Sequence, residues 1–394
     1  MKRLVITTLC LLSVYPLLSQ SRDSTIVRPE DRDVIDLITN KIKFKGKASN
    51  PKRGRVYFSA VPSATSNVGS KTMILSAINA AFYVGDPKNT YISSIYFVPY
   101  TDLSRQYGFT TTFNLWYDQN LWNFPGEFKI QKLSPYSYGL GSNSSRDDQF
   151  IIDYDYIRFY GAANRKLRTY LYGGVGLNYD WHYNVQANIA TQPNLFTDYA
   201  VGTGSSSSSL GVTFNLLYDN RFNSINPDKG FYSTFVYRIN PGFLGNSSVW
   251  GSIYFDTRRY FQMPTPKRNI LATWFFYWGS FGEVPYLNLP GTSMEYNARS
   301  GRGYTYGRYR GKQMLYFESE YRFTISNNGL LGGVFFINLQ SLTEPKTEKF
   351  DKVTLASGFG ARIKFNKASN TNLDLDVGFG NNSVLFYINL GELF

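Results

Sequence analysis

The clearest pattern in the chain is an alternation of apolar and polar side chains over segments of about ten residues. In residues 313–324, Glu318, Glu320 and Arg322 share one face, and the opposite face carries Leu315, Phe317, Ser319, Tyr321 and Phe323. A strand with one charged and one mostly apolar face separates two different surroundings. If the apolar face meets lipid, the charged face must line a wet interior, which indicates a transmembrane β-barrel.

Similar alternation between turn residues predicts about sixteen strands, the even number that single-chain bacterial barrels have. They lie near residues 54–62, 72–84, 89–99, 107–117, 121–132, 149–162, 167–182, 208–218, 230–240, 247–260, 268–279, 312–325, 328–340, 352–365, 371–379 and 382–394. If the first strand rises from the periplasm, the long connections 133–148, 183–207, 280–311 and 341–351 all lie outside. The predicted fold class is therefore all-β, a transmembrane antiparallel β-barrel. The Gly- and Arg-rich loop before residue 312 is placed to fold inward and plug the lumen.

The beginning of the chain has the features of a secretory signal peptide. Lys2 and Arg3 precede an apolar run over residues 4–18, followed by small and polar residues. We predict a cleaved signal peptide over 1–20, a short periplasmic segment over 21–53 and a barrel over 54–394, located in the Gram-negative outer membrane. We expect the periplasmic segment to be a flexible lead-in, and a plug or docking helix around the amphipathic residues 34–38 is the alternative.

Composition narrows the choice of partners. Aromatic residues make up 18% of the chain, as suits the interfacial girdles of a barrel. The formal charge of +13 falls by two without Lys2 and Arg3, and the basic residues are scattered singly. An exported protein of this kind is expected to meet anionic outer-membrane lipids or lipopolysaccharide, and no nucleic acid. Residues 21–394 contain no cysteine, which excludes disulfides and cysteine nucleophiles there.

We find no catalytic pattern and expect no enzyme activity, no cofactor and no metal. The single histidine, His182, lies among aromatic residues near a predicted strand end, where we expect an interfacial residue. No serine has the context of a nucleophile elbow. Acid pairs such as Asp374 and Asp376 can bind divalent cations, but at this spacing on a strand they more often line a wet lumen.

Three motifs together resemble the bacterial surface antigen family, the barrels related to BamA and TamA. The first is the turn 218–232, YDNRFNSINPDKGFY, with Asp219, Arg221, Pro227 and Gly230 at the motif positions. The second is Arg302, Gly303 and Tyr304, similar to the family's inward loop motif. The third is the final segment 389–394, NLGELF, which is similar to the family's closing strand and ends on an aromatic residue, as in a sorting signal.

The resemblance implies specific contacts. The loop arginine, Arg302, would reach through the lumen to Glu320 and, on the next strand, to Asn338, where the family has an acid. A weak seam would join the first strand near Tyr57 to the last strand, whose outward residues we expect to be Val384, Phe386, Ile388, Leu390 and Phe394.

The resemblance also implies a role in assembling, inserting or translocating outer-membrane or secreted proteins. Related proteins usually carry POTRA modules before the barrel, and about thirty residues are too few for one. We therefore expect a barrel-only member whose partner, an outer-membrane or periplasmic protein, captures the substrate. The alternatives are a non-catalytic scaffold subunit, which includes a homodimer, and a gated pore. Substituting Arg302 separates them: a pore becomes leakier, an assembly factor loses its clients, and a scaffold changes little.

Overall fold

The computed structural model describes residues 31–41, 54–65, 73–103, 105–188, 199–221, 223–265, 268–295 and 299–394. The predicted signal peptide lies outside these residues and stays a prediction. None of the described helices is long and apolar enough to cross a membrane.

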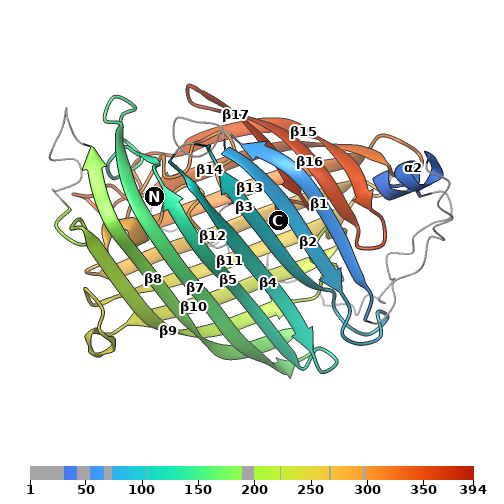
Figure 1. Cartoon of the computed structure of the whole chain (residues 1–394), viewed down its shortest axis with the longest axis horizontal. Coiled ribbons are helices and arrows are strands. Elements are labelled where there is room, and N and C mark those ends of the chain that lie inside the picture. Colours follow the sequence, from blue (N-terminus) through green and yellow to red (C-terminus); the bar gives the residue numbers. More distant parts are fainter. Residues whose placement is uncertain are drawn as a thin grey trace, which may run out of the picture.

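The described chain forms one antiparallel β-barrel whose strands run obliquely around the barrel axis (Figure 1). The strands are β1 Val56–Thr65, β2 Met73–Phe82, β3 Ser93–Thr101, β4 Tyr107–Tyr117, β5 Trp122–Leu133, β6 Tyr136–Ser137, β7 Phe150–Arg168, β8 Leu171–Asn188, β9 Ser206–Asp219, β10 Gly230–Asn240, β11 Trp250–Gln262, β12 Ile270–Gly282, β13 Gln313–Thr324, β14 Leu331–Leu342, β15 Thr354–Asn366, β16 Thr371–Gly380 and β17 Ser383–Leu390. All sixteen predicted strands are present, and the two-residue β6, which pairs with β7 beyond the end of β5, is the one addition. The predicted fold class is confirmed.

The predicted faces of the strands are also seen. On β13 the side chains of Glu318, Glu320 and Arg322 are buried inside the barrel, and Phe317 and Tyr321 are exposed outside it. Other strands likewise carry exposed outward apolar residues, among them Phe159, Val175, Phe214, Phe235, Phe335, Leu355 and Phe379. A continuous apolar outer surface of this kind suits contact with lipid.

The connections differ between the two ends of the barrel. We call the end that carries residues 83–92, 118–121, 169–170, 220–229, 263–269, 325–330 and 367–370 the inner end, and the opposite end the outer end. The long connections 134–149, 283–312 and 343–353 all lie at the outer end, because every neighbouring pair of long strands is antiparallel. Long extracellular loops and short periplasmic turns follow this pattern in bacterial barrels.

A short helix, α2 Val34–Lys41, forms in the segment that we expected to be a flexible lead-in. It lies beside the inner end, next to the turn between β15 and β16 (Figure 1). The Lys367 ammonium contacts the Asp36 carboxylate at 2.6 Å, and the Lys367 backbone N–H donates to Asp33 at 2.9 Å. Residues 34–41 are therefore helical, and the segment contacts the barrel at Lys367.

The end of the chain departs from our prediction. The strand β17 stops at Leu390, and Gly391 adopts a positive φ of 84° that turns the chain into the barrel. Phe394 is buried inside the barrel rather than directed outward, whereas Val384 and Phe386 are exposed as predicted. Leu390 is also buried, although its position in β17 is on the same face as Val384 and Phe386. Phe394 packs against Trp274 and Tyr260 inside the barrel, so the four residues 391–394 form an internal tail.

Candidate functional site

The inward loop 283–312 carries Arg302 into the interior, where the side chain is 1% exposed. Gly301 and Gly303 on either side have positive φ angles of 71° and 101°, a backbone conformation that favours glycine. The loop backbone lies directly on β16: a Cβ atom on Gly378 would come within 2.6 Å of the Gly303 nitrogen. The Gly303 N–H donates to the Tyr387 hydroxyl of β17 at 2.9 Å. Small residues on both sides thus permit close contact between loop and wall.

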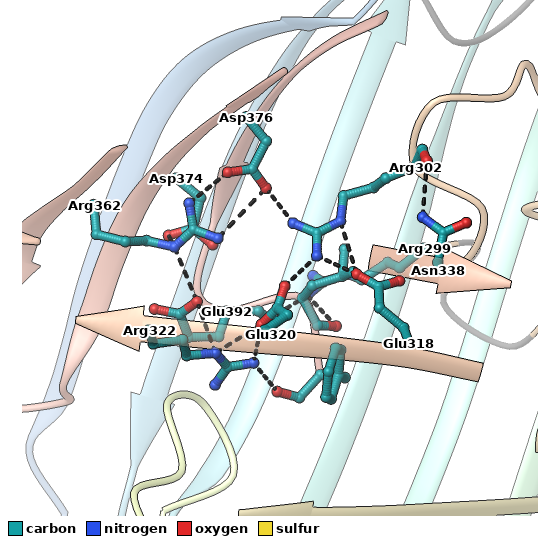
Figure 2. Close-up of polar contacts among 12 residues, drawn as sticks. Arg299, Arg302, Glu318, Glu320, Arg322, Asn338, Arg362, Asp374, Asp376 and Glu392 are labelled. Carbon is teal, nitrogen blue, oxygen red and sulfur yellow. Dashed lines mark hydrogen bonds and ion pairs between the residues drawn. The ribbon is translucent and has the colours of Figure 1, made fainter. Parts of the chain in front are cut away.

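The guanidinium of Arg302 pairs with three carboxylates from two strands (Figure 2). It contacts Glu318 and Glu320 of β13, and its Nη1 donates to Asp376 of β16 at 2.6 Å. It also lies 3.5 Å from the ring centroid of Phe336 on β14. Burial alone would lower the pKa of Arg302, but the carboxylates, Glu318 first, raise it well above its ordinary value. The Arg302 cation therefore joins the inward loop to strands β13, β14 and β16.

The structure places the predicted loop residues as follows. Arg302 contacts Glu320, and the Tyr304 hydroxyl donates to the Leu355 carbonyl oxygen at 2.6 Å. Asn338 is not an acceptor for the guanidinium, because its amide instead donates to the Arg302 backbone carbonyl at 2.9 Å.

Sequence reasoning missed Glu318 and Asp376 as partners of Arg302. Glu318 could have been found, because it shares the inward face of Glu320. Asp376 lies on a strand distant in sequence, and only closure of the barrel brings it to the loop.

A second group of charges ties the internal tail to the same walls. Arg362 of β15 contacts Asp376 at 2.5 Å and Glu392 at 3.0 Å, and Arg322 of β13 contacts Glu320 at 2.6 Å. The Asn372 amide donates to Glu392 at 2.6 Å. Burial alone would raise the pKa of Glu392, but the guanidiniums of Arg362 and Arg322 lower it to about 2.

These residues make one continuous network that we call the latch (Figure 2). It contains the guanidiniums of Arg302, Arg322 and Arg362 and the carboxylates of Glu318, Glu320, Asp374, Asp376 and Glu392. Acids outnumber bases, so each guanidinium serves more than one carboxylate. The latch holds the inward loop, the tail and strands β13, β15 and β16 together.

The predicted turn motif covers the inner end. Arg221 forms a two-pronged ion pair with Asp219, with Nη2 2.8 Å from Oδ2, and stacks over Tyr232 at 4.3 Å. Pro227 is buried, and Gly230 has a positive φ of 118° at the start of β10.

Beyond the motif, residues 223–226 cross the barrel mouth to the opposite wall. Asn223 donates to the Ser369 carbonyl at 3.1 Å, and the Glu392 N–H donates to the Ile225 carbonyl at 3.3 Å. The connection 220–229 and the internal tail thus form a lid over the inner end.

A separate ion network lines the wall formed by β5, β7, β8 and β10. Arg158 contacts Glu127 and Asp180 at 3.1 Å each, and Arg238 contacts Asp180 at 2.7 Å. The prediction for His182 was wrong: it is buried inside the barrel and stacks on Tyr156 with centroids 4.2 Å apart. In the described part of the chain, no group of three or more His, Cys, Asp or Glu residues is arranged to hold a metal ion.

The interior retains open space beside the inward loop and the internal tail. One cavity of about 280 Å³ lies among strands β3 to β12 and includes Tyr160, Asn215 and Arg238 in its lining. A second, of about 250 Å³, is lined by Leu75 of β2, Tyr387 and Asn389 of β17, and Arg302. The inward loop fills the lumen next to the latch strands β13, β15 and β16, and the lumen next to β2 to β5 stays open.

Among the described residues, the seam between β1 and β17 is the least paired junction of the barrel. One residue pair joins the two strands among the described residues, Thr65 with Tyr387, whereas β1 and β2 share ten pairs. The paired residue of β1 at this seam is Thr65, whereas we expected residues 56–58 to pair with the end of the chain. Antiparallel register from Thr65 and Tyr387 would set Phe58 opposite Phe394, but Phe394 is folded inside the barrel.

No family model and no curated protein matches the chain. The crystal structure of BamA from Haemophilus ducreyi lacking POTRA domains 1–3 aligns with a TM-score of 0.54 at 11% identity, over 86% of this chain and 70% of that chain. The chain has the BamA-like barrel fold.

CdiB provides two further matches to this BamA-like barrel. The Acinetobacter baumannii protein aligns with a TM-score of 0.50 at 11% identity over 85% of this chain and 60% of that one. The Escherichia coli protein aligns with a TM-score of 0.52 at 9% identity over 86% of this chain and 63% of that one. The chain thus spans less than two thirds of either CdiB chain.

Proposed function

We propose that this protein is an outer-membrane barrel that helps to assemble, insert or translocate outer-membrane or secreted proteins together with a protein partner. The observation that carries the proposal is the seam between β1 and β17. Other long neighbouring strands share at least seven residue pairs, and this junction has one in the described residues. A strand edge with little pairing can bind an incoming strand by main-chain hydrogen bonds.

The interior supports the same proposal. The cavity beside the seam is lined by residues of β2 and β17, so space is present on the inner side of the weak junction. On the β17 side of the seam, the latch holds the inward loop to β13, β15 and β16, and β16 is the neighbour of β17. Because the latch holds β13, β15 and β16 together, the seam can open while the rest of the barrel stays folded.

The proposal is tested by a disulfide across the seam. Residues 21–394 contain no cysteine, so the pair Thr65→Cys and Tyr387→Cys introduces the only two thiols of that region, at positions that face each other in register. We expect oxidation to reduce the amount of folded client barrels or secreted protein in cells, and reduction to restore it. The reduced variant controls for both substitutions, including loss of the Tyr387 hydroxyl.

A matched lock controls for the disulfide itself. Ser319 and Ile337 are register partners in the fully paired junction of β13 and β14, and the variant Ser319→Cys/Ile337→Cys locks a place that need not open. Normal client levels with both locks oxidised would refute the proposed function.

The two cavities favour a gated pore as the second candidate. Planar-bilayer conductance distinguishes it. A pore held shut by the loop should conduct strongly once Arg302 is replaced, with no change in client proteins. An assembly barrel should lose clients when its seam is locked, whatever its conductance.

A further inference from the structure

The tip of the hairpin formed by β7 and β8 carries a concentrated positive charge at the inner end. Arg165, Lys166 and Arg168 are all exposed, and Leu167 between them is 58% exposed. None of the ion pairs in the described part of the chain includes these three cations. They contrast with the latch arginines Arg302, Arg322 and Arg362, which are paired with carboxylates.

This basic tip continues directly into the outward apolar surface. Leu167 lies over Gly173, where a Cβ atom would come within 2.8 Å of the leucine side chain and within 3.5 Å of Leu216. Further along β8, Val175 and Leu177 are exposed on the same face. The leucine thus belongs to the lipid-facing surface, and the cations lie at its margin.

Aromatic side chains lie at the same height along the barrel axis as the three cations. Arg165 is the register partner of Trp122 on β5, and its guanidinium lies 5.8 Å from the indole. On the other side, Tyr170 and Tyr218 are in edge contact at 6.2 Å. Indole and phenol rings are enriched where a membrane protein crosses the boundary between hydrocarbon and headgroups. The three cations therefore lie at headgroup depth.

The backbone of the tip is held in place. The strand register shifts between Lys166 and Arg168. The Lys166 N–H donates to the Leu121 carbonyl at 2.8 Å, and the Tyr170 carbonyl accepts from the Asp219 N–H at 2.9 Å. Three cations on a fixed backbone lose less conformational freedom on binding than three on a flexible loop.

We propose that Arg165, Lys166 and Arg168, with Trp122 beside them, bind the phosphate headgroup of an anionic phospholipid in the leaflet at the inner end. The guanidiniums and the ammonium supply charged donors to phosphate, the indole lies at the headgroup level, and Leu167 contacts the acyl chain. A phospholipid is favoured over a soluble partner because apolar and cationic parts of the site adjoin, as they do in the ligand. This inference does not depend on the proposed function.

The test measures binding of phosphatidylglycerol to the purified protein in neutral detergent by native mass spectrometry, with phosphatidylcholine as the uncharged comparison. We expect the wild type to prefer phosphatidylglycerol. Each basic residue near a membrane surface contributes about a fivefold gain, so R165Q/K166Q/R168Q should bind phosphatidylglycerol roughly 100-fold more weakly. Inorganic phosphate at the same concentration should not displace the lipid, and displacement would overturn the assignment to a phospholipid.

A matched variant controls for total charge. Lys346, Lys349 and Lys352 are exposed at the outer end, so K346Q/K349Q/K352Q loses the same charge far from the tip. Equal lipid binding by the two triple variants would overturn the proposal. If the first triple variant does not fold, as judged by its heat-dependent mobility in gels, R165Q alone should show about a fivefold loss, and wild-type affinity in R165Q would be equally decisive against it.

Discussion

Replacing Arg302 by methionine should destabilise the barrel strongly. The change removes a buried guanidinium that contacts Glu318, Glu320 and Asp376. Two of these acids keep another cation: Glu320 retains Arg322 at 2.6 Å and Asp376 retains Arg362 at 2.5 Å. Among the described residues, Glu318 is left with the Tyr316 hydroxyl as its hydrogen-bond donor. Loss of one partner of a buried ion pair costs about 3–5 kcal/mol, so we expect R302M to lose unfolding free energy of that order.

The assay is urea unfolding in lipid vesicles followed by tryptophan fluorescence. Because Glu318 is the acid that loses its cation, R302M/E318Q should recover about half of the loss, a coupling that a double-mutant cycle measures. The control R105M removes an exposed arginine from an outer-end connection and should change the free energy by less than about 0.5 kcal/mol. An effect of R302M below about 1 kcal/mol, or a double variant no more stable than R302M, would refute the latch as described.

Two further predictions concern the loop and the tail. G378A adds a methyl group 2.6 Å from the Gly303 nitrogen and should lower the unfolding free energy by about 1–3 kcal/mol in the same assay. The control G204A adds a methyl group that meets no atom within 4 Å and should have little effect. Equal effects of the two variants would contradict the close contact between loop and wall. Glu392 has a folded-state pKa of about 2 against an ordinary value of 4.5, so its stabilising contribution is complete above about pH 4.5 and is lost as the pH falls through 2. E392Q should therefore be less stable than wild type at pH 7, and the difference should shrink towards pH 2; a constant difference would show that Glu392 does not act through its charge.

Much of the wall could be predicted from the sequence because a strand between lipid and a wet interior must alternate. That requirement fixes which side of β13 carries Glu318 and Glu320, and turn residues fix the strand count. The same local rules assigned Phe394 to an outward position by extending the alternation of β17. They failed there because Gly391 ends the strand, and the tail instead packs on Trp274 of β12.

The contacts that hold the latch together could not be predicted in full. Asp376 and Arg362 approach Arg302 because β15 and β16 close the barrel beside the inward loop, and residues far apart in sequence meet only through that closure. The lid over the inner end has the same origin, since Asn223 meets Ser369 across the barrel mouth. The resemblance of the turn and loop motifs indicated which segments fold inward and left their partners on the far wall unspecified.

The central proposal, that clients bind at the seam between β1 and β17, is tested most directly by photocrosslinking on β1 in living cells. A photoreactive residue in place of Phe58, which is 66% exposed on β1, should capture unfolded client barrels. The same residue in place of Phe335, which is 59% exposed on the fully paired β14, should capture far fewer. Client adducts confined to Phe58 are the predicted result. Equal capture at the two positions, or none at Phe58, would contradict the account.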